Sequence, residues 1–305
     1  MAKKYSSGYI KEQAKTYAIK KFFNEKGVSI MTNLVNRTEM KQVAGYVERK
    51  SMLYQTDVEY AAVDNVWCVN HVLGCSHLCG GCENPWCYAL KMKKRFKKVN
   101  SVEEWSEPKI VKNTLELLAK ELPRKKDRIS AVFLSFTTDP FMYRYPEITA
   151  LTLEVIRLIN SFGIKCIVLT KGVLPVDQLS MLSPENEYGI SLVSMSEEYR
   201  QMYEPGAAPI RERLGALMEL KRRGFKTWIS MEPYPTPNVY NQNLFEVLNG
   251  VAFVDKIIFG RTNYCATVSA FPDHKRFYNE CAMQVIDFCK SRDIECIIKR
   301  KTITE

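Results

Sequence analysis

The sequence predicts an α/β protein, a partial (β/α)6-type barrel of about six or seven strand–helix units. Its 305 residues suit one such barrel with a short appendage, and 46% hydrophobic and 26% charged residues are typical of a globular protein with a sizeable core. After about residue 60, short apolar runs alternate with amphipathic segments. This alternation indicates parallel strands joined by crossover helices.

The expected elements follow from hydrophobic periodicity. Strands are expected at residues 65–72, 129–136, 164–170, 188–193, 226–231, 256–259 and 295–299. Helices are expected at residues 87–98, 106–122, 147–162, 175–182, 209–223, 244–248 and 274–290. Gly163 directly follows one amphipathic helix and is its expected C-cap.

Polar residues gather directly after three of these strands, at residues 137–139, 170–171 and 232–234. In barrels of this kind the carboxyl ends of the strands build the active site. The first strand ends at a cysteine-rich segment. We therefore expect the cysteines and these polar residues to share one mouth of the barrel.

The chain carries a formal net charge of +10, which favours a polyanionic partner such as nucleic acid. We expect a basic N-terminal extension at residues 1–55, with a basic helix at 9–26, followed by the barrel at 56–305. No run of 18 apolar residues occurs, and the first residues lack the apolar stretch of a secretory signal. The sequence therefore predicts a cytoplasmic protein without a membrane partner.

Four of the ten cysteines, Cys75, Cys79, Cys82 and Cys87, lie within thirteen residues. A disulfide framework is typical of small secreted chains, whereas clustered thiols in a reducing compartment more often bind metal. Thiolates are soft ligands that suit an iron–sulfur cluster. Four cysteines could also form a zinc knuckle. The spacing alone leaves both kinds of site open.

Residues 74–89 resemble the signature of radical S-adenosylmethionine (SAM) enzymes, in the branch of spore photoproduct lyase and its relatives, which reads Gly-Cys-x-His-x-Cys-x-Tyr-Cys-Tyr-Ala. The similarity continues in order along the chain. It includes residues 135–140, 149–155, 168–171, 189–192 and 204–214. Several ordered motifs are more specific than one cysteine cluster.

This resemblance implies a radical SAM barrel in which three thiolates hold a [4Fe-4S] cluster and leave one iron open for SAM. Reductive cleavage of SAM would yield a 5′-deoxyadenosyl radical, with a flavodoxin or ferredoxin as electron donor. Lys171 matches the family lysine that meets the cofactor carboxylate. Thr138, Asp139 and Ser191 would bind its amine and ribose. Trp86 and Tyr88 would pack on the cofactor or in the core.

The sequence departs from the family pattern at two places. Cys75, Cys79 and Cys82 have the usual spacing, but the aromatic-Cys-Tyr-Ala element lies at residues 86–89. We favour Cys75, Cys79 and Cys87 as ligands, with Cys82 as the alternative to Cys87; a third alignment uses Cys75, Cys82 and Cys87. The second departure is Phe136, which stands where spore photoproduct lyase has a hydrogen-donating cysteine, so the hydrogen-atom donor is not identified.

The resemblance and the positive charge favour a nucleic-acid substrate and a repair lyase or a base- or sugar-modifying enzyme. A basic run supports this hypothesis, at Lys91, Lys93, Lys94, Arg95, Lys97 and Lys98. The alternatives are modification of a peptide or small molecule, and a non-enzymatic zinc or iron–sulfur nucleic-acid-binding protein. We expect Glu204 and Arg213 to form a structural pair and Glu232 to contact cofactor or substrate. Catalytic residues and oligomeric state stay unassigned.

Overall fold

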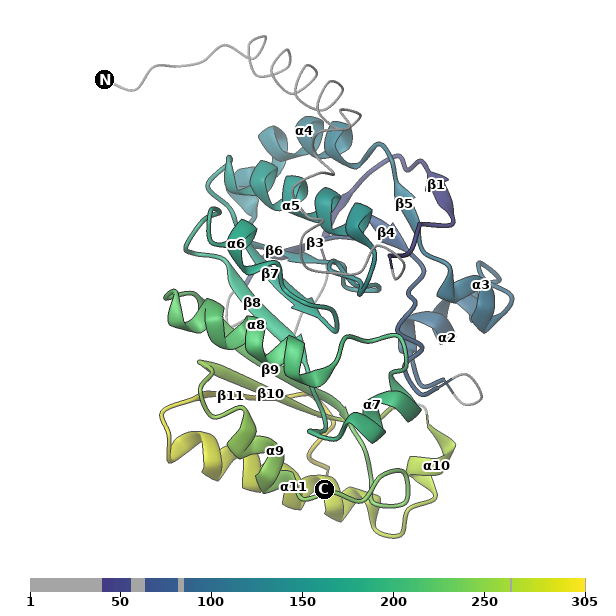
Figure 1. Ribbon diagram of the computed structural model, residues 1–305, viewed down its shortest axis with the longest axis vertical. Helices are drawn as coiled ribbons and strands as arrows, with labels where there is room; N and C mark the ends of the chain where they lie inside the picture. The colour runs from purple at the N-terminus through teal and green to yellow at the C-terminus, as the bar shows by residue number, and fades with distance from the viewer. Residues whose placement is uncertain (1–39, 56–63, 82–84, 264, 305) are drawn as a thin grey trace.

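The computed structural model of the protein describes residues 40–55, 64–81, 85–263 and 265–304 (Figure 1). The predicted basic helix at residues 9–26, and Cys82, lie outside these ranges. Among the described residues, no helix has the length and apolar character needed to cross a membrane.

An eight-stranded sheet forms the body of the barrel, in the order β11-β10-β9-β8-β7-β6-β3-β2. Neighbours from β3 to β11 are parallel, and β2 runs antiparallel to β3. The strands are β2 Leu53–Gln55, β3 Val66–Val69, β6 Ala131–Leu134, β7 Lys165–Thr170, β8 Glu187–Ser191, β9 Lys226–Tyr234, β10 Lys256–Arg261 and β11 Glu295–Ile298. Six crossovers in chain order confirm the partial (β/α)6 barrel that the sequence predicts.

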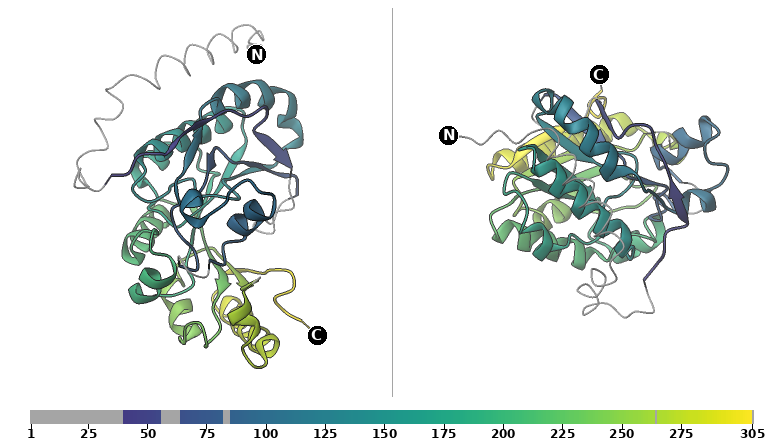
Figure 2. Two further views of the ribbon diagram at one scale, coloured as in Figure 1. Left: turned by 90° about the vertical axis from the view of Figure 1, so that its right-hand side faces the viewer. Right: turned by 90° about the horizontal axis from the view of Figure 1, so that it is seen from above.

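Helices cover the outside of this sheet, as Figures 1 and 2 show. They are α2 Tyr88–Arg95, α3 Val102–Ser106, α4 Thr114–Lys125, the 3-10 helix η2 Lys126–Arg128, α5 Pro146–Asn160, α6 Val176–Leu179, α7 Glu197–Tyr203, α8 Ile210–Arg222, α9 Leu244–Gly250, α10 Ala266–Ser269 and α11 His274–Lys290. The predicted C-cap at Gly163 is wrong by two residues, because α5 ends at Asn160 and its C-cap is Ser161. Gly163, with φ of 74°, lies in the turn that follows and donates to Asn160 O (2.9 Å).

The large apolar core lies between the sheet and these helices, and a smaller one fills the barrel interior. The interior cluster consists of side chains that point away from the helices, with Phe133, Ile167 and Trp228 among its buried members. Along β3, for example, Trp67 and Val69 join the large core while Val66 and Cys68 point inward. Both faces of the parallel strands are thus buried, as their continuous apolar runs require.

A small second sheet, in the order β1-β5-β4, corrects two of the predicted elements. The single helix predicted at residues 106–122 is wrong, because β5 (Lys109–Val111) interrupts it and α4 begins only at Thr114. Pro108 disfavours helix at the residue before it, and β-branched Ile110 is completely buried. The strand predicted at 65–72 is split into β3 and β4 (Val72–Leu73).

Part of the predicted extension also belongs to these sheets. β1 (Gly45–Val47) pairs with β5, and β2 pairs with β3. Sequence periodicity did not identify these three-residue strands because they are too short to show a pattern. The division into an extension at 1–55 and a barrel at 56–305 stays a prediction.

A buried ionic cluster lies at the amino-terminal ends of the strands, opposite the predicted mouth. Glu187 on β8 accepts hydrogen bonds from Lys165 Nζ (2.8 Å) and Lys256 Nζ (3.0 Å), and Lys256 lies 5.3 Å from the ring centre of Trp228. Burial raises the pKa of Glu187, but Lys256 and Lys165 outweigh it and the net shift is downward. The two cations therefore share one carboxylate, and Lys226 Nζ lies 3.9 Å from it. Lys256 is completely buried.

We predict that Glu187→Gln lowers the free energy of unfolding near neutral pH by about 3 kcal/mol, because it leaves Lys256 buried without its counter-charge. The lowered pKa means that this stabilisation is present above the unfolded-state pKa of about 4.3 and is lost as the pH falls below it. Urea denaturation at several pH values should show the two proteins converging in acid. Glu280→Gln, at an exposed helical pair with Arg276, is the control and should change little; an equal effect in both variants would contradict the prediction.

Candidate active site

The cysteine-rich loop, residues 74–87, connects β4 to α2 at the carboxyl end of the first parallel strand. The N–H of Cys75 donates to Trp105 O on α3 (2.8 Å). Gly74 has φ of 83°, and a Cβ there would lie 2.8 Å from the same carbonyl. Only glycine readily adopts this positive φ and also leaves room for the Trp105 carbonyl, so the first residues of the loop pack directly against α3.

The other side of the loop packs on the segment after α7. The N–H of Gly80 donates to Tyr203 O (2.7 Å). A Cβ on Gly206 would lie 1.8 Å from Ser76 O, so the backbone of the cysteine loop occupies the space of that missing side chain. This contact explains the glycine of the Glu-Pro-Gly motif at residues 204–206. The loop is clamped between α3 and this motif.

The described thiols of the loop, Cys75, Cys79 and Cys87, are free and electrostatically coupled to one another. Burial is the main cause that raises the pKa of each thiol, to about 12 for Cys79, and the neighbouring thiols raise the pKa values of Cys75 and Cys79 further. Lys171 acts in the opposite direction on Cys79 and Cys87. Neighbouring thiols that burial keeps protonated become thiolates when a metal binds them.

This donor set fits an iron–sulfur cluster. Within the described residues, no three or more His, Cys, Asp or Glu side chains are arranged to hold a single metal ion. A cubane cluster contacts its cysteines through different iron atoms, so the thiols need not converge on one point. Two further buried polar atoms of the loop, Ser76 Oγ and His77 Nε2, have no hydrogen-bond partner in the described structure. Buried groups of this kind are typical where a bound group completes the site.

Asp139, which follows β6, is a buried cross-link at the mouth. Its Oδ1 accepts from the Thr170 hydroxyl (2.6 Å) and the Phe141 amide (2.9 Å), and its Oδ2 accepts from the Lys171 amide (2.7 Å). The same Oδ2 lies 3.4 Å from His77 Nδ1. Burial lowers the pKa of His77 although Asp139 opposes it. The carboxylate thereby connects the cysteine loop to the ends of β6 and β7.

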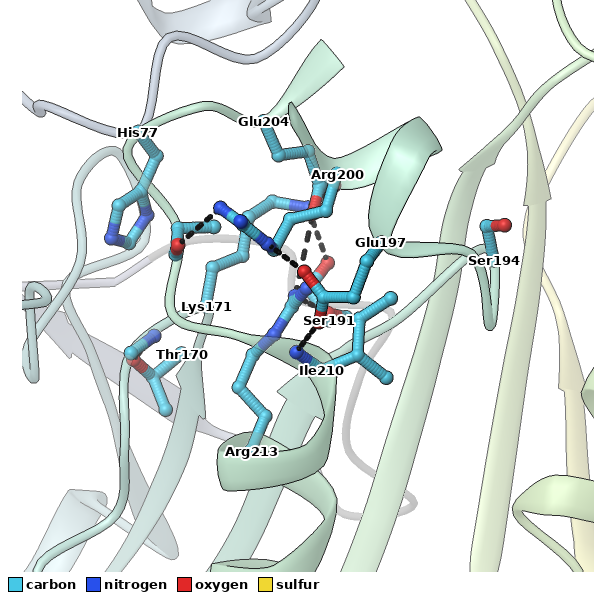
Figure 3. Close-up of polar contacts among 12 residues, drawn as sticks. His77, Thr170, Lys171, Ser191, Ser194, Glu197, Arg200, Glu204, Ile210 and Arg213 are labelled. Carbon is cyan, nitrogen blue, oxygen red and sulfur yellow. Dashed lines mark hydrogen bonds and ion pairs between the residues drawn. The ribbon is translucent and has the colours of Figure 1, made fainter. Parts of the chain in front are cut away.

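A buried charge network lies beside Asp139 (Figure 3). Lys171 Nζ donates to Glu204 Oε1 (2.6 Å) and Ser191 Oγ (3.1 Å). Arg213 Nη1 donates to Ser191 O (2.8 Å) and Glu204 Oε2 (3.3 Å), which confirms the predicted structural pair of Glu204 and Arg213. Burial opposes both charges, yet the pKa of Lys171 is raised and that of Glu204 is lowered because each stabilises the other's ionised form. Two cations thus share one carboxylate.

The two predicted aromatic residues flank Cys87. Trp86 stacks on Tyr203, with ring centres 5.2 Å apart and planes at 28°. Tyr88 begins α2 and is 45% exposed; its hydroxyl donates to Phe136 O, and the two rings meet edge to face with centres 6.0 Å apart. Both rings therefore have protein partners at the mouth, and Tyr88 also presents a large exposed surface.

The remaining predicted residues lie around the same mouth. The Thr138 hydroxyl donates to Val72 O (3.2 Å). Glu232, near the end of β9, lies 3.8 Å from Lys299 Nζ, directly after β11. The structure thus brings together Cys75, Cys79, Cys87, Thr138, Asp139, Lys171 and Ser191, as the sequence predicts. The sequence analysis marked both Lys171 and Glu204 but not their pairing, because 33 residues separate the two partners.

Residues 69–240 match the family model of the radical SAM superfamily. The chain belongs to this superfamily. The match contains the cysteine loop, Lys171 and Glu204, so the site described above lies within the family domain. Enzymes of this superfamily use a [4Fe-4S] cluster and SAM, and these are the cofactors of this protein.

Two kinds of relative resemble this radical SAM protein. An uncharacterized protein, ORF301, of Acidianus two-tailed virus is 26% identical over 189 residues, and the match spans 60% of each chain. Spore photoproduct lyase in complex with a dinucleoside spore photoproduct has a TM-score of 0.59 at 13% identity, over 83% of this chain and 80% of the other. A spore photoproduct lyase variant with bound AdoMet gives 0.58 at 12% identity. At these identities the likeness to spore photoproduct lyase is one of fold, and the predicted fold family is confirmed.

We predict that Gly206→Ala destabilises the radical SAM domain by about 2 kcal/mol or more, because its Cβ would collide with the backbone of the cysteine loop. Iron content after anaerobic reconstitution should fall with it. Gly215→Ala is a matched control inside α8, where a Cβ meets nothing within 4 Å. That change should stabilise the helix by up to about 1 kcal/mol. Thermal melting and iron analysis of both variants test the difference, and equal behaviour would refute the clamp.

Proposed function

We propose that this radical SAM enzyme holds its [4Fe-4S] cluster through Cys75, Cys79 and Cys87, with Cys82 as the alternative third ligand, and acts on nucleic acid in the cytoplasm. The observation that carries the proposal is the grouping of three partly buried thiols, which lie within electrostatic range of one another, with Lys171 at the carboxyl ends of the barrel strands. When bound, the cluster and SAM supply a 5′-deoxyadenosyl radical by reductive cleavage of the cofactor. A flavodoxin or ferredoxin is the proposed electron donor.

The chain's own residues bind and orient the cofactor. Lys171 carries its charge in a buried setting and offers N–H groups to the cofactor carboxylate, while Glu204 balances one of the two positive charges of Lys171 and Arg213 before the cofactor arrives. Ser191 and Thr138 contribute hydroxyl groups at the ends of β8 and β6, on either side of β7. Asp139 holds Lys171 and His77 in place, and Trp86 and Tyr88 pack at the barrel mouth. The burial of Asp139, Ser191 and Glu204 keeps water away from the reacting atoms.

The nucleic-acid substrate is supported by the net charge of +10 and by the fold shared with spore photoproduct lyase. Phe136 distinguishes this site from that of a photoproduct lyase, because its ring has no hydrogen atom to donate easily. We therefore propose repair or modification of a base or sugar that has been turned out of its stack into the barrel mouth.

Anaerobic incubation of the reconstituted protein with dithionite and SAM should yield 5′-deoxyadenosine. Substituting Cys75, Cys79 or Cys87 singly by Ala should abolish this product and lower the iron content, because each loss removes a cluster ligand. Cys265→Ala, at a free cysteine before α10, is the control and should keep both. Full iron retention in Cys87→Ala together with loss in Cys82→Ala would show that Cys82 is the third ligand. A cluster-loaded protein that forms no 5′-deoxyadenosine would refute the proposed reaction.

Lys171→Met should weaken SAM binding by about ten- to a hundredfold, the value of a charge-assisted hydrogen bond. Equilibrium dialysis of the cluster-loaded protein with labelled SAM measures this effect. Lys120→Met removes an exposed lysine of α4 and serves as the control. Unchanged affinity in Lys171→Met would remove this lysine from the cofactor site.

A further inference from the structure

Three cations from two separate segments lie together beside the cysteine loop. Arg49 follows β1, Lys93 belongs to α2, and Lys98 follows that helix. Burial is the first cause that lowers the pKa of Lys93, and the charges of Arg49 and Lys98 lower it further. Arg49 and Lys98 therefore lie within electrostatic range of Lys93.

The end of α2 folds Lys98 back toward Lys93. The N–H of Lys98 donates to Lys93 O (2.9 Å), and the N–H of Lys97 donates to Lys94 O (3.0 Å). Lys97 has φ of 52°, in the position where such helix ends usually carry glycine. A lysine in this conformation costs about 1 kcal/mol. The chain thus accepts backbone strain in a turn that brings two lysines together.

Arg49 is anchored at the mouth by two asparagines. The Asn113 side chain accepts from Arg49 N (3.1 Å) and donates to Arg49 O (2.8 Å), so the backbone is held on both sides. The guanidinium Nη1 donates to Asn70 O, directly after β3 (3.2 Å). Asn70 also accepts from the Thr137 amide (3.2 Å), next to the predicted cofactor residues. The guanidinium therefore lies at the carboxyl end of β3, the first parallel strand.

Within the described ranges, none of these three cations forms an ion pair with a carboxylate, whereas cations elsewhere on the surface do, such as Lys120, Arg222 and Arg276. Exposed aromatic rings stand at both ends of the same helix. Tyr88 at its start is 45% exposed and Phe96 at its end is 64% exposed. In the part of the chain that the structure describes, the three cations lack a carboxylate partner, and exposed aromatic rings lie near them. This combination matches a ligand that has both anionic groups and flat bases.

We propose that Arg49, Lys93 and Lys98 bind the phosphodiester backbone of a nucleic acid at the edge of the barrel mouth, with Phe96 stacking on an unpaired base. This inference rests on the proposed nucleic-acid substrate and assigns the residues that hold it. The patch adjoins α2, whose first residue Tyr88 contacts Phe136 at the mouth. A strand held on the patch therefore presents a neighbouring nucleotide to the site. An acidic polypeptide would satisfy the charges but would not use Phe96.

The test compares two double variants that lose the same charge. Lys93→Gln with Lys98→Gln removes the patch lysines, and Arg222→Gln with Arg276→Gln removes exposed cations of α8 and α11. Fluorescence anisotropy of a labelled single-stranded DNA with the full-length, cluster-loaded protein gives the affinity at several salt concentrations. The patch variant should bind roughly tenfold more weakly, and the slope of log affinity against log salt should fall by about 1.4, or about 0.7 for each lost contact.

Three outcomes would overturn this proposal. The first is that the two double variants bind the single-stranded DNA with equal affinities and equal salt slopes, and the second is that Phe96→Ser leaves this affinity unchanged. The third is that polyglutamate displaces the labelled DNA as effectively as unlabelled DNA does. Formation of 5′-deoxyadenosine by the unsubstituted protein is measured in parallel. If DNA binding depends on the patch but no 5′-deoxyadenosine forms, the proposed radical reaction is refuted and the proposed binding patch stands. If 5′-deoxyadenosine forms but DNA binding does not depend on the patch, the binding patch is refuted and the radical reaction stands.

Discussion

The buried carboxylate of Glu204 is the interaction on which the rest of the site depends. Lys171 and Arg213 share it in a region where an unpaired charge would cost several kcal/mol. Two residues further along, Gly206 lies under the cysteine loop, with no room for a side chain. The short segment at residues 204–206 therefore has two roles. It supplies the carboxylate that Lys171 and Arg213 share, and its glycine makes room for the cysteine loop.

The mouth is assembled from loops that would otherwise be independent. Asp139 connects the cysteine loop to the ends of β6 and β7, and Gly74 fixes the start of that loop against α3. Such cross-links hold the groups of a site in place before the ligands bind, so less binding energy is spent on ordering them. The proposed cationic patch of Arg49, Lys93 and Lys98 is also held in part by hydrogen bonds between separate segments. Its Arg49 is anchored by Asn113, as the inner residues are anchored by Asp139.

Helices and strands with a strong hydrophobic periodicity could be predicted from the sequence, whereas short strands without a clear periodicity could not. The helix expected at residues 274–290 agrees with α11 in both bounds, and the strand at 164–170 differs from β7 by one residue. By contrast, β5 was hidden inside an expected helix because its three residues gain their stability from β1 and β4. Local pattern cannot reveal a strand whose partners lie elsewhere in the chain.

The sequence by itself determined the barrel, the radical SAM signature and the residues expected at the mouth, because these depend on local periodicity and on ordered motifs. Only the tertiary structure decided which side chains meet. It paired Lys171 with Glu204, placed Gly206 under Ser76 and joined the Arg49 guanidinium to Asn70 O. Each of these contacts joins distant parts of the chain. Charge neutralisation and close packing select such contacts only when the whole fold has formed.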